Sequence, residues 1–393
     1  MSQDSIVIVS AARTPMGGMM GALSDVRSPD LCATAIKAAL ARADLQGTDI
    51  DEVVMGCVLP AGLGQAPARQ AARAAGVHDG AGATTVNKMC GSGMKAVMLA
   101  HDQLKAGQVD IMVAGGMENM SQAPYMLPKA RAGMRMGHQQ VIDHMFFDGL
   151  EDAYEGGLMG SFAQQTADDF NVSRAAMDDF AIGSLEKALQ AIESGAFKDE
   201  IAAVTVKSRK GETVVDTDEQ PGNARMDKIR QLKPAFKQDG TITAANASSI
   251  SDGGSALVLM RESEAQKRGL KPMARIVAHS THAQLPAEFS IAPIGAISKV
   301  LERAGWSKDE VDLYEINEAF AVVSMLAISE LGLDADKVNV NGGACALGHP
   351  IGSSGSRILV TLLYALKNLG KSKGVASLCI GGGEATAVAV EML

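Results

Sequence analysis

Cys90 stands in a sequence context that suits a nucleophile. It follows an apolar, β-rich run at 84–87 and precedes Gly91-Ser92-Gly93, so we expect a strand, a tight turn and then a helix. Backbone N–H groups at the start of a helix lower the pKa of a thiol, and they also bind the oxygen of an acyl carbonyl. The alternative is a small buried cysteine that serves packing alone.

Two further residues carry groups that move protons. Among seven histidines, His349 alone sits in a Gly-rich turn beside a rigid proline, and a fixed imidazole suits the general base for a thiol. Cys379 follows an apolar run and precedes the glycines 381–383, which indicates a backbone that another group approaches closely. Two thiols facing one cavity would serve as nucleophile and as acid/base. The alternatives are a histidine that satisfies a turn and a second packing cysteine.

Asn317 and Glu318 follow the predicted strand 312–316. An asparagine amide can position a water or donate to a carbonyl, and the glutamate would orient a histidine. The alternative is a helix N-cap with an acidic residue in the first turn.

The segment 223–237 is a local basic patch in an acidic chain. The segment contains one acidic residue, Asp227, and five basic ones, which are Arg225, Lys228, Arg230, Lys233 and Lys237. Such a patch suits a polyanionic ligand, for example a nucleotide with a 3′-phosphate and a diphosphate. The alternative is a solvated surface, where charge runs usually lie.

The sequence lacks the motifs of several other chemistries. It contains no Walker loop, dinucleotide fingerprint, H-E-x-x-H or G-x-S-x-G, so its Gly-rich turns suit an acyl group better than a phosphate or a hydride cofactor. The other cysteines, Cys32, Cys57 and Cys345, are expected to pack in the core. An odd number of cysteines with wide spacing and no C-x-x-C predicts free thiols in a reducing compartment, without disulfides or a structural zinc site.

The composition is that of a globular protein. Of 393 residues, 47% are hydrophobic and 21% are charged, which provides a large core. A net charge of −9 and a single Trp disfavour nucleic acid as a partner. No apolar run approaches about 18 residues, which excludes a transmembrane helix, and the fold begins at about residue 5 without a basic leader. These features predict a cytoplasmic protein with no membrane partner.

The chemistry-bearing turns belong to an α/β pattern that occurs twice. Apolar runs lie in the first half at 6–9, 51–56, 84–87 and 110–116, and in the last third at 274–278, 311–315, 338–341 and 375–378. In each set the third run ends in a Gly-rich turn that opens a helix, and ligands of α/β sheets bind beyond the carboxyl ends of strands. Residues 120–270 are expected to form an insertion of loops and short helices, with an amphipathic helix at 177–193.

Taken in order, these segments resemble the thiolase family, and within it the acetyl-CoA acetyltransferases (acetoacetyl-CoA thiolases). The resemblance extends over essentially the whole chain and rests on the blocks 9–15, 87–93, 115–121, 246–248, 252–253, 317–320, 338–355 and 379–383. It implies an α/β thiolase fold, in which two pseudo-repeated βαβαβαββ halves form a layered αβαβα core with a loop domain. The implied boundaries are 1–120 for the N-terminal half, 121–255 for the inserted loop domain and 256–393 for the C-terminal half.

The resemblance also implies a role for each catalytic residue. Cys90 matches the acylated nucleophile and His349 the base that activates it. Cys379 matches the residue that moves the proton at the second substrate. Asn317 matches the residue that holds a water in one oxyanion hole together with His349, and the backbone N–H groups of Cys90 and Gly381 match the other hole.

Coenzyme A is the implied substrate and product, and no metal or other cofactor is implied. The positions that match its binding site are Leu150, Met159, Phe236, Ala244, Ser248 and Phe320. An arginine often found near the CoA head in the family corresponds to about Gly222, so Arg225 or Lys228 is expected to substitute for it. Leu158 stands where many short-chain members have histidine, which bears on the acyl pocket. The stretch 289–293 resembles that of mitochondrial-type acetoacetyl thiolases.

The implied activity is the reversible condensation of two acetyl-CoA into acetoacetyl-CoA and CoA, in fatty acid metabolism. The alternatives are a degradative 3-ketoacyl-CoA thiolase of broader chain length and a non-catalytic CoA- or lipid-binding protein on the same fold. A decarboxylating condensing enzyme that uses an acyl carrier protein is disfavoured by Cys379. The family assembles as homodimers or homotetramers, and the loop around 120–145 is expected to make tetramer contacts.

Overall fold

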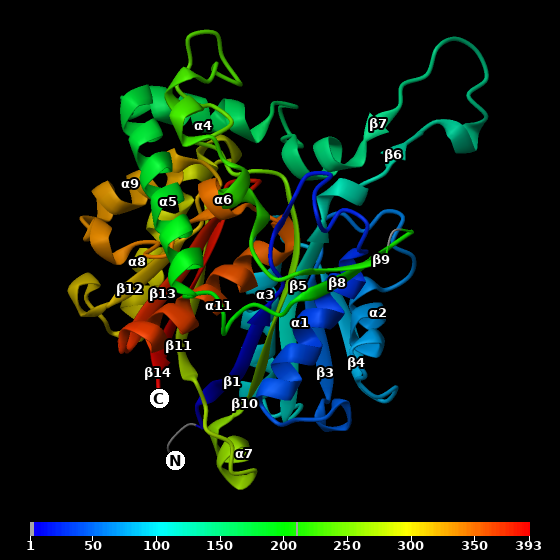
Figure 1. Ribbon diagram of the computed structural model, residues 1–393, viewed down its shortest axis with the longest axis vertical. Coiled ribbons are helices and arrows are strands. Elements are labelled where there is room, and N and C mark those ends of the chain that lie inside the picture. The colour runs from blue at the N-terminus through cyan, green and yellow to red at the C-terminus, as the bar shows by residue number, and fades with distance from the viewer. Residues whose placement is uncertain (1–3, 210) are drawn as a thin grey trace.

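The first-half apolar runs form one half of a continuous sheet (Figure 1). In the computed structural model, which describes residues 4–209 and 211–393, the strands of this half lie in the order β4-β3-β5-β10-β1. Residues 1–3, part of the segment interpreted as free of a leader, lie outside the described residues, as does Lys210. The strand bounds are β1 Ile6–Arg13, β3 Glu52–Gly56, β4 Gly82–Val86, β5 Ile111–Asn119 and β10 Ser251–Arg261, and the two-residue β2 (Gly17–Gly18) pairs with β10.

The last-third runs form the other half of the sheet, in the order β12-β13-β14-β11. The bounds are β11 Ala274–Ala283, β12 Leu313–Ile316, β13 Lys373–Ile380 and β14 Glu384–Met392. A short antiparallel contact between β1 and β11, Val7 opposite Arg275 and Ile8 opposite Ala274, joins the two halves. The pattern that repeats in the sequence is therefore a repeat of strand arrangement as well.

The predicted strand at 338–341 is wrong. Only a single bridge, between Tyr314 and Val338, is formed there. Asn339 has a positive φ of 47° and its side-chain amide exchanges hydrogen bonds of 2.8 and 2.9 Å with the backbone N–H and C=O of Ile316. The side chain thus takes the place that a neighbouring backbone would have in a strand ladder.

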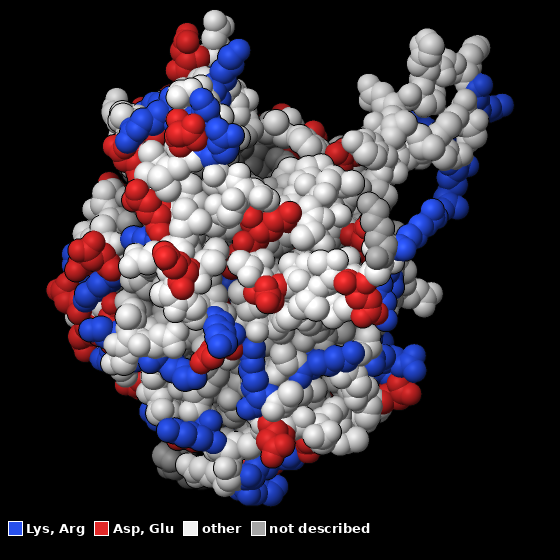
Figure 2. All heavy atoms as spheres, viewed as in Figure 1, with Lys and Arg blue, Asp and Glu red and all other residues white. Residues whose placement is uncertain are grey.

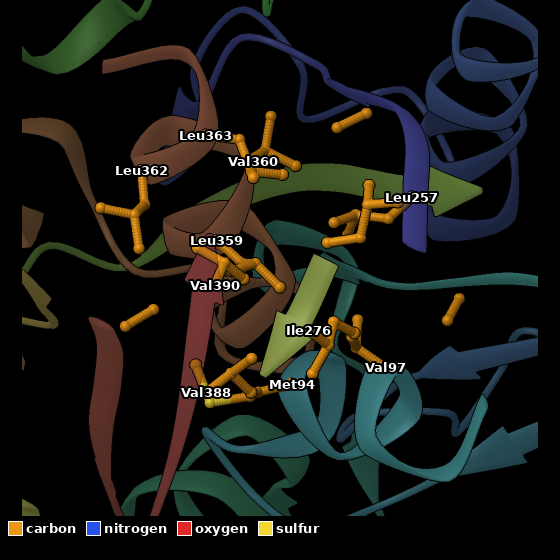
Figure 3. Close-up of a cluster of buried hydrophobic side chains, with 14 of the residues drawn as sticks. Met94, Val97, Leu257, Ile276, Leu359, Val360, Leu362, Leu363, Val388 and Val390 are labelled. Atoms are coloured by element: carbon orange, nitrogen blue, oxygen red, sulfur yellow. The ribbon is translucent and has the colours of Figure 1, made fainter. Parts of the chain in front are cut away.

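Successive side chains along each strand point to opposite faces of the sheet, so the core is divided into layers. In β1, Ile6 and Ile8 point into the central cluster with helices α3 and α11, whereas Val7 and Val9 point outward to helices α1 and α2. The C-terminal half packs in the same way on its outer face against α8 and α9. The layers are therefore α, β, α, β, α, as expected, and Figure 3 shows the central cluster. The helix bounds are α1 Ser28–Arg42, α2 Pro67–Ala74, α3 Ser92–Lys105, α8 Ala292–Ala304, α9 Ala321–Leu331 and α11 Ile351–Leu369.

Helix α11 lies at the centre of the molecule and is buried from Ile351 to Leu366. Its first turns contain only small residues between Gly352 and Ser356, so its backbone approaches α3 closely. A Cβ placed on Gly355 would lie 2.5 Å from the backbone nitrogen of Met94. This close approach brings the first turn of α11 beside the first turn of α3.

The expectation that loops and short helices extend over 120–270 is wrong at its end, because 251–261 forms β10, a central strand of the sheet. Up to residue 250, the inserted region consists of loops, helices and short strands (Figure 1). Its amphipathic helix α5 runs over Arg174–Ser194, with a capping serine at 173 and Gly195 in the left-handed conformation at its end. The other elements are β6 Tyr125–Met126, β7 Ile142–Asp143, α4 Met159–Asp169, β8 Val204–Ser208, β9 Gly211–Val215 and α6 Glu219–Asn223. The short helices α7 Glu262–Lys267 and α10 Ala344–Leu347 complete the fold.

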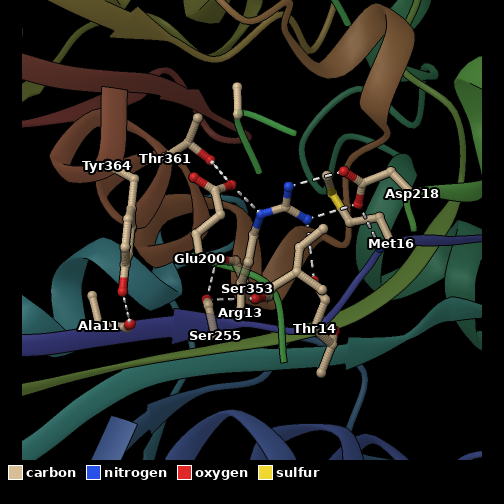
Figure 4. Close-up of polar contacts among 12 residues, drawn as sticks. Ala11, Arg13, Thr14, Met16, Glu200, Asp218, Ser255, Ser353, Thr361 and Tyr364 are labelled. Carbon is tan, nitrogen blue, oxygen red and sulfur yellow. Dashed lines mark hydrogen bonds and ion pairs between the residues drawn. The ribbon is translucent and has the colours of Figure 1, made fainter. Parts of the chain in front are cut away.

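A buried arginine ties this insertion to the sheet (Figure 4). Arg13, at the end of β1, donates to both carboxylate oxygens of Asp218 at 2.7 and 2.9 Å and to Glu200 at 2.5 Å. Asp218 also accepts the backbone N–H of Met16 at 2.8 Å. All three charged side chains are fully buried, so the segment that follows Asp218 is held in one position over the sheet.

The predicted boundary at 255/256 falls inside β10. That strand pairs with β1 and with β5, so its hydrogen bonds group it with the N-terminal half. The division into three units otherwise stays a prediction.

The molecular surface carries charges of both signs. On the face shown in Figure 2, Lys and Arg lie interspersed with Asp and Glu, and the hairpin around β6 and β7 projects from the body. Among residues 4–209 and 211–393, no helix combines the length and the apolar character needed to cross a bilayer.

Candidate active site

Cys90 lies in the turn between β4 and α3, as expected. The turn is closed by hydrogen bonds from the N–H groups of Gly91 and Ser92 to the carbonyls of Lys88 and Met89, at 3.0 Å each. Met89 has a positive φ of 47°, a conformation that few non-glycine residues adopt and that is common at functional sites. A Cβ on Gly91 would lie 2.3 Å from Cδ1 of Ile380, so a larger residue here would force that side chain to move. The nucleophile turn therefore packs directly against the end of β13.

Backbone N–H groups from both halves lie near the Cys90 thiol. They belong to Gly381 and to Cys90 itself, both of which favour the thiolate, and they are the two donors expected to form an oxyanion hole. Burial nevertheless raises the pKa of Cys90 to about 11, with these N–H groups opposing the rise and the charge of Glu118 adding to it. The expectation of a lowered thiol pKa is thus wrong for the resting protein, because loss of hydration outweighs the helix start.

Cys379 lies at the carboxyl end of β13, next to Cys90. Its side chain is buried, and burial together with the neighbouring Cys90 raises its pKa well above the ordinary value. The glycines that follow make a sharp turn into β14, with φ of 90° at Gly382 and 84° at Gly383. A thiol kept neutral in this way can give a proton next to an acyl group on Cys90, and the thiolate that remains can then take one.

His349 is held as a neutral imidazole with one free nitrogen. Its Nδ1 lies 2.5 Å from Oγ of Ser354, and that hydroxyl donates to the carbonyl of Pro350 at 2.9 Å. Because the hydroxyl proton is used, Nδ1–H of His349 must be the donor, and Nε2 carries the lone pair. Nε2 is buried and has no partner among the described residues. Burial, followed by the charge of Arg357, lowers the pKa of His349 to about 3.

Asn317 presents a second unpartnered group. Its Oδ1 faces the guanidinium of Arg357 at 3.5 Å, and its Nδ2 is buried without a hydrogen-bond partner in the described chain. Arg357 therefore sets the orientation of the amide and also lies close enough to affect His349. Nε2 of His349 and Nδ2 of Asn317 are thus both buried without partners, and such atoms indicate a place for a polar ligand or a water.

Glu318 has neither of the roles considered for it. It does not orient His349: its carboxylate accepts from Ser184 at 2.7 Å, Asn339 at 2.8 Å and the N–H of Cys345 at 3.1 Å. Nor do Asn317 and Glu318 cap a helix, since α9 begins at Ala321 after an extended Phe320 without a side-chain cap. Glu318 instead holds the Gly-rich turn that leads to α10.

Four of the residues predicted to bind CoA or to act on it share one apolar cluster, namely Cys379, Met159, Phe236 and Phe320. The rings of Phe236 and Phe320 meet edge to face at 6.2 Å. Met159 lies against Gly381, whose Cβ would be 3.8 Å from its sulfur. Leu150 packs with Met89 and Cys90 in a neighbouring cluster. These side chains make an apolar wall beside the two thiols.

Three of the four remaining predicted CoA positions line a cavity of about 260 Å³, and Ser248 does not. Arg225, Lys228 and Ala244 line it, together with Ser249 and Cys345. Ser248 is adjacent in the chain and donates its N–H to the carbonyl of Ala319, next to Phe320. Cys345 therefore lines a cavity as well as packing, while Cys32 and Cys57 are buried as predicted. All five thiols are free.

Two of the other basic residues of the 223–237 patch face acidic partners, and the third, Lys233, is exposed. Arg230 forms a close pair with Asp179, and Lys237 lies 2.6 Å from Asp168. These two charges belong to the solvated surface, in agreement with the alternative considered for the patch. Arg225 and Lys228 line the cavity, but both are exposed and lie 3.4 and 3.8 Å from the carboxylate of Asp227.

Two family models together cover nearly the whole chain. "Thiolase, N-terminal domain" matches residues 6–263 and "Thiolase, C-terminal domain" matches residues 270–392. The chain belongs to the thiolase family. The first model contains Cys90 and the second contains Asn317, His349 and Cys379, so the thiolase site described above is assembled from both domains.

Individual thiolases resemble this one along their entire lengths. The acetyl-CoA acetyltransferase of Pseudomonas aeruginosa is 47% identical over 98% of both chains. Acetyl-CoA acetyltransferase 2 of Arabidopsis thaliana is 49% identical, over 99% of this chain and 97% of that protein. The crystal structure of the Bacillus anthracis acetyl-CoA acetyltransferase superposes with a TM-score of 0.97 at 41% identity, covering 100% of this chain and 99% of that one.

Sequence reasoning missed three residues that position this thiolase's site. Ser354 fixes the tautomer of His349, and Arg357 orients Asn317. Glu118 accepts N–H groups from Val58 and Leu59 and from Gly352 in the first turn of α11. The signal for Ser354 was its spacing, because a serine four residues after Pro350 reaches back one helical turn. Nothing local marks Arg357 or Glu118, whose partners come from distant segments.

Proposed function

We propose that the protein is an acetyl-CoA C-acetyltransferase, which condenses two acetyl-CoA into acetoacetyl-CoA and CoA and catalyses thiolysis in reverse. The full-length similarity to proteins named acetyl-CoA acetyltransferase supports the reaction class. The observation that carries the assignment of roles is that the N–H of Gly381 and a second thiol, Cys379, both lie near the Cys90 thiol and act on its charge or are acted on by it. A nucleophile, a second acid/base and an oxyanion donor thereby meet at one point.

In the first step, His349 Nε2 takes the proton of Cys90 as the sulfur attacks the thioester carbonyl of acetyl-CoA. The bond from carbon to Cys90 forms, the bond from carbon to the CoA sulfur breaks, and CoA leaves with the proton from His349. The N–H groups of Cys90 and Gly381 stabilise the negative oxygen of the tetrahedral intermediate. Since both partners are neutral at rest, we expect the proton to move only as the thioester reacts.

In the second step, Cys379 gives its proton to the neutral His349, and the resulting thiolate takes a proton from the methyl group of a second acetyl-CoA. The enolate oxygen is stabilised by protonated His349 or by a water held at the Asn317 amide, and the enolate carbon attacks the acetyl group on Cys90. The sulfur–carbon bond breaks and acetoacetyl-CoA forms, and the Cys90 thiolate takes the proton back from His349, which returns all three groups to their resting state. For CoA, Arg225 or Lys228 would bind phosphate groups, while the Met159, Phe236 and Phe320 side chains contact the apolar part of the pantetheine arm.

The test is consumption of acetoacetyl-CoA with added CoA, beside 3-ketohexanoyl-, 3-ketodecanoyl- and 2-methylacetoacetyl-CoA. We expect turnover of the C4 substrates, lost by about four orders of magnitude or more in Cys90→Ala. Preference for the longer chains would make the protein a degradative thiolase whose pocket is opened by Leu158. No turnover of any substrate would revive the non-catalytic binding protein.

A second variant separates the two thiols. Cys379→Ser is expected to become acetylated on Cys90 by acetyl-CoA but not to form acetoacetyl-CoA, because the proton-abstracting group is missing. Mass spectrometry of the Cys90 peptide reports the acetylation. Failure of Cys379→Ser to become acetylated would contradict the division of labour. Assembly as a homodimer or homotetramer, with the β6–β7 hairpin at the tetramer contact, remains a prediction.

A further inference from the structure

A cluster of metal-ligating side chains lies outside the site described above. His101 and Asp102 stand near the end of α3, and His279 stands on β11. With a rise of about 1.5 Å per residue, Asp102 is roughly 15 Å along α3 from the turn that carries Cys90. Because α3 starts after β4 and β11 belongs to the C-terminal half of the sheet, the cluster joins the two halves of the molecule.

The three side chains converge on one oxygen. Nδ1 of His101 and Nε2 of His279 each lie 2.9 Å from Oδ1 of Asp102. The two rings meet edge to face, with centroids 4.9 Å apart and planes at 84°. All three ligand atoms lie within 4.8 Å of one another, and no other group of three such side chains occurs as closely in the part of the chain that the structure describes.

Hydrogen bonds within the cluster do not use all of its polar atoms. A single carboxylate oxygen receives both imidazoles, while Nδ1 of His279 is buried and has no partner among residues 4–209 and 211–393. The cluster therefore has the ligand atoms of a cation site, with one of its buried nitrogens still unpartnered.

The spacing suits a small divalent ion. Zinc bonds of about 2.0–2.2 Å in a tetrahedron place ligand atoms roughly 3.4 Å apart. The observed separations, from 2.9 to at most 4.8 Å, bracket that value, so small rotations of the side chains suffice. The side chain of Asp102 is 55% exposed, which leaves a path for the ion and room for a water ligand.

The basic side chains around the cluster bind backbone carbonyls and not the side chains of the three proposed ligands. Lys105 is one turn further along α3, and its ammonium donates to the carbonyl of Asp4 at 2.9 Å. Arg303 donates to the backbone carbonyl of His279 at 2.7 Å and so helps to fix that residue in place. The Asp102 carboxylate is the one acidic group within the cluster itself.

We propose that His101, Asp102 and His279 form a binding site for one divalent transition-metal ion of the zinc type, completed by water. Two imidazoles and one carboxylate are a donor set that suits zinc and its first-row neighbours. Since the ligands come from both halves, the ion binds the folded protein and stabilises it, and it takes no part in the reaction at Cys90.

The test uses the untagged, full-length protein freed of metal by a chelator and titrated with Co²⁺. We expect visible ligand-field bands that saturate at one Co²⁺ per chain and disappear when Zn²⁺ is added. Zn²⁺ should also raise the thermal unfolding midpoint. Each of His279→Gln and Asp102→Asn should weaken Co²⁺ binding at least about tenfold, while His138→Gln, an exposed histidine in the β6–β7 hairpin, should bind as the parent does.

Several results would overturn the site. These are the absence of saturable visible bands, equal binding by His279→Gln and Asp102→Asn and the parent, or loss of binding in His138→Gln. Bands from thiolate-to-cobalt charge transfer would place the ion on a cysteine and likewise contradict the proposal. Thiolysis activity of the variants, which lie outside the catalytic machinery, reports that they are folded. Since Asp102 is largely exposed, its variant keeps the test decisive if His279→Gln fails to fold.

Discussion

At the scale of single residues, the proposed nucleophile Cys90 and the proposed base His349 are both uncharged. Burial moves the pKa of Cys90 up to about 11 and that of His349 down to about 3, so between these values neither is charged. A neutral thiol does not react with every electrophile in the cell, and a neutral imidazole with a free Nε2 accepts a proton only when a substrate draws it. Because of this burial, we expect the Cys90 thiol to react only when a thioester is bound beside it.

This charge state can be measured from the ultraviolet absorbance of thiolate. The difference between the parent protein and Cys90→Ala should show no thiolate at pH 7–8 and should rise only above about pH 10, because thiolate forms as the pH approaches the pKa. A thiolate signal from Cys90 near neutral pH would contradict the neutral pair. Cys32→Ala serves as the control, since burial raises the pKa of Cys32 to about 12 and its removal should change the spectrum still less in this range.

At the scale of elements, the site depends on how closely α3 and α11 approach. His349 immediately precedes α11 and Cys90 precedes α3, so the distance between the helix starts sets the distance between nucleophile and base. Small residues in the first turns of α11 permit this approach, and Gly355 packs directly on the backbone of Met94.

Two glycine substitutions test the packing. In a helix interior, Gly→Ala normally stabilises by roughly 0.5–1 kcal/mol. Gly183→Ala in α5, where nothing lies within 4 Å of the new Cβ, should show that gain. Gly355→Ala in α11 should instead lose about 1–3 kcal/mol through overpacking, together with activity. Urea unfolding midpoints measure both, and equal shifts in the two variants would refute the close approach.

At the scale of the whole molecule, the insertion is held over the sheet by charge inside the core. Burial opposes the charge of Arg13, but Asp218 and Glu200 outweigh it and raise the pKa of its guanidinium. The segment after Asp218 continues to Arg225 and Lys228 on the cavity. A contact at the end of β1 therefore decides where the proposed CoA-binding residues lie.

Removing this anchor should be costly. Arg13→Met leaves Asp218 and Glu200 buried without a cation, and we expect a loss of about 3–5 kcal/mol in the free energy of unfolding. The matched control is Arg73→Met, which breaks a surface pair with Asp79 in which the two side chains are 63% and 74% exposed. It should change stability by less than about 1 kcal/mol. Chemical unfolding of both variants gives the comparison, and similar costs would show that the buried pair contributes no more than a surface one.

Much of the fold and the site could be predicted from local patterns. Apolar runs marked the strands, and residue type with neighbouring glycines and proline marked Cys90, His349 and Cys379. Predictions from local patterns were wrong where a side chain hydrogen-bonds to a segment that is distant in the sequence. The Asn339 side chain supplies the hydrogen bonds that the predicted strand at 338–341 would have made to Ile316, and Glu318 binds the turn before α10 instead of a histidine.

The sequence by itself determined the candidate catalytic residues and most of the strands, though not β10 and β14, because these depend on residue type and on neighbours a few positions away. Only the tertiary structure decided the protonation of Cys90 and His349, the partners Ser354 and Arg357, and the meeting of α3 with β11. The physical reason is that loss of hydration and charge–charge contact depend on which distant segments pack together, and these terms outweigh the local helix-start effect that predicted a lowered thiol pKa.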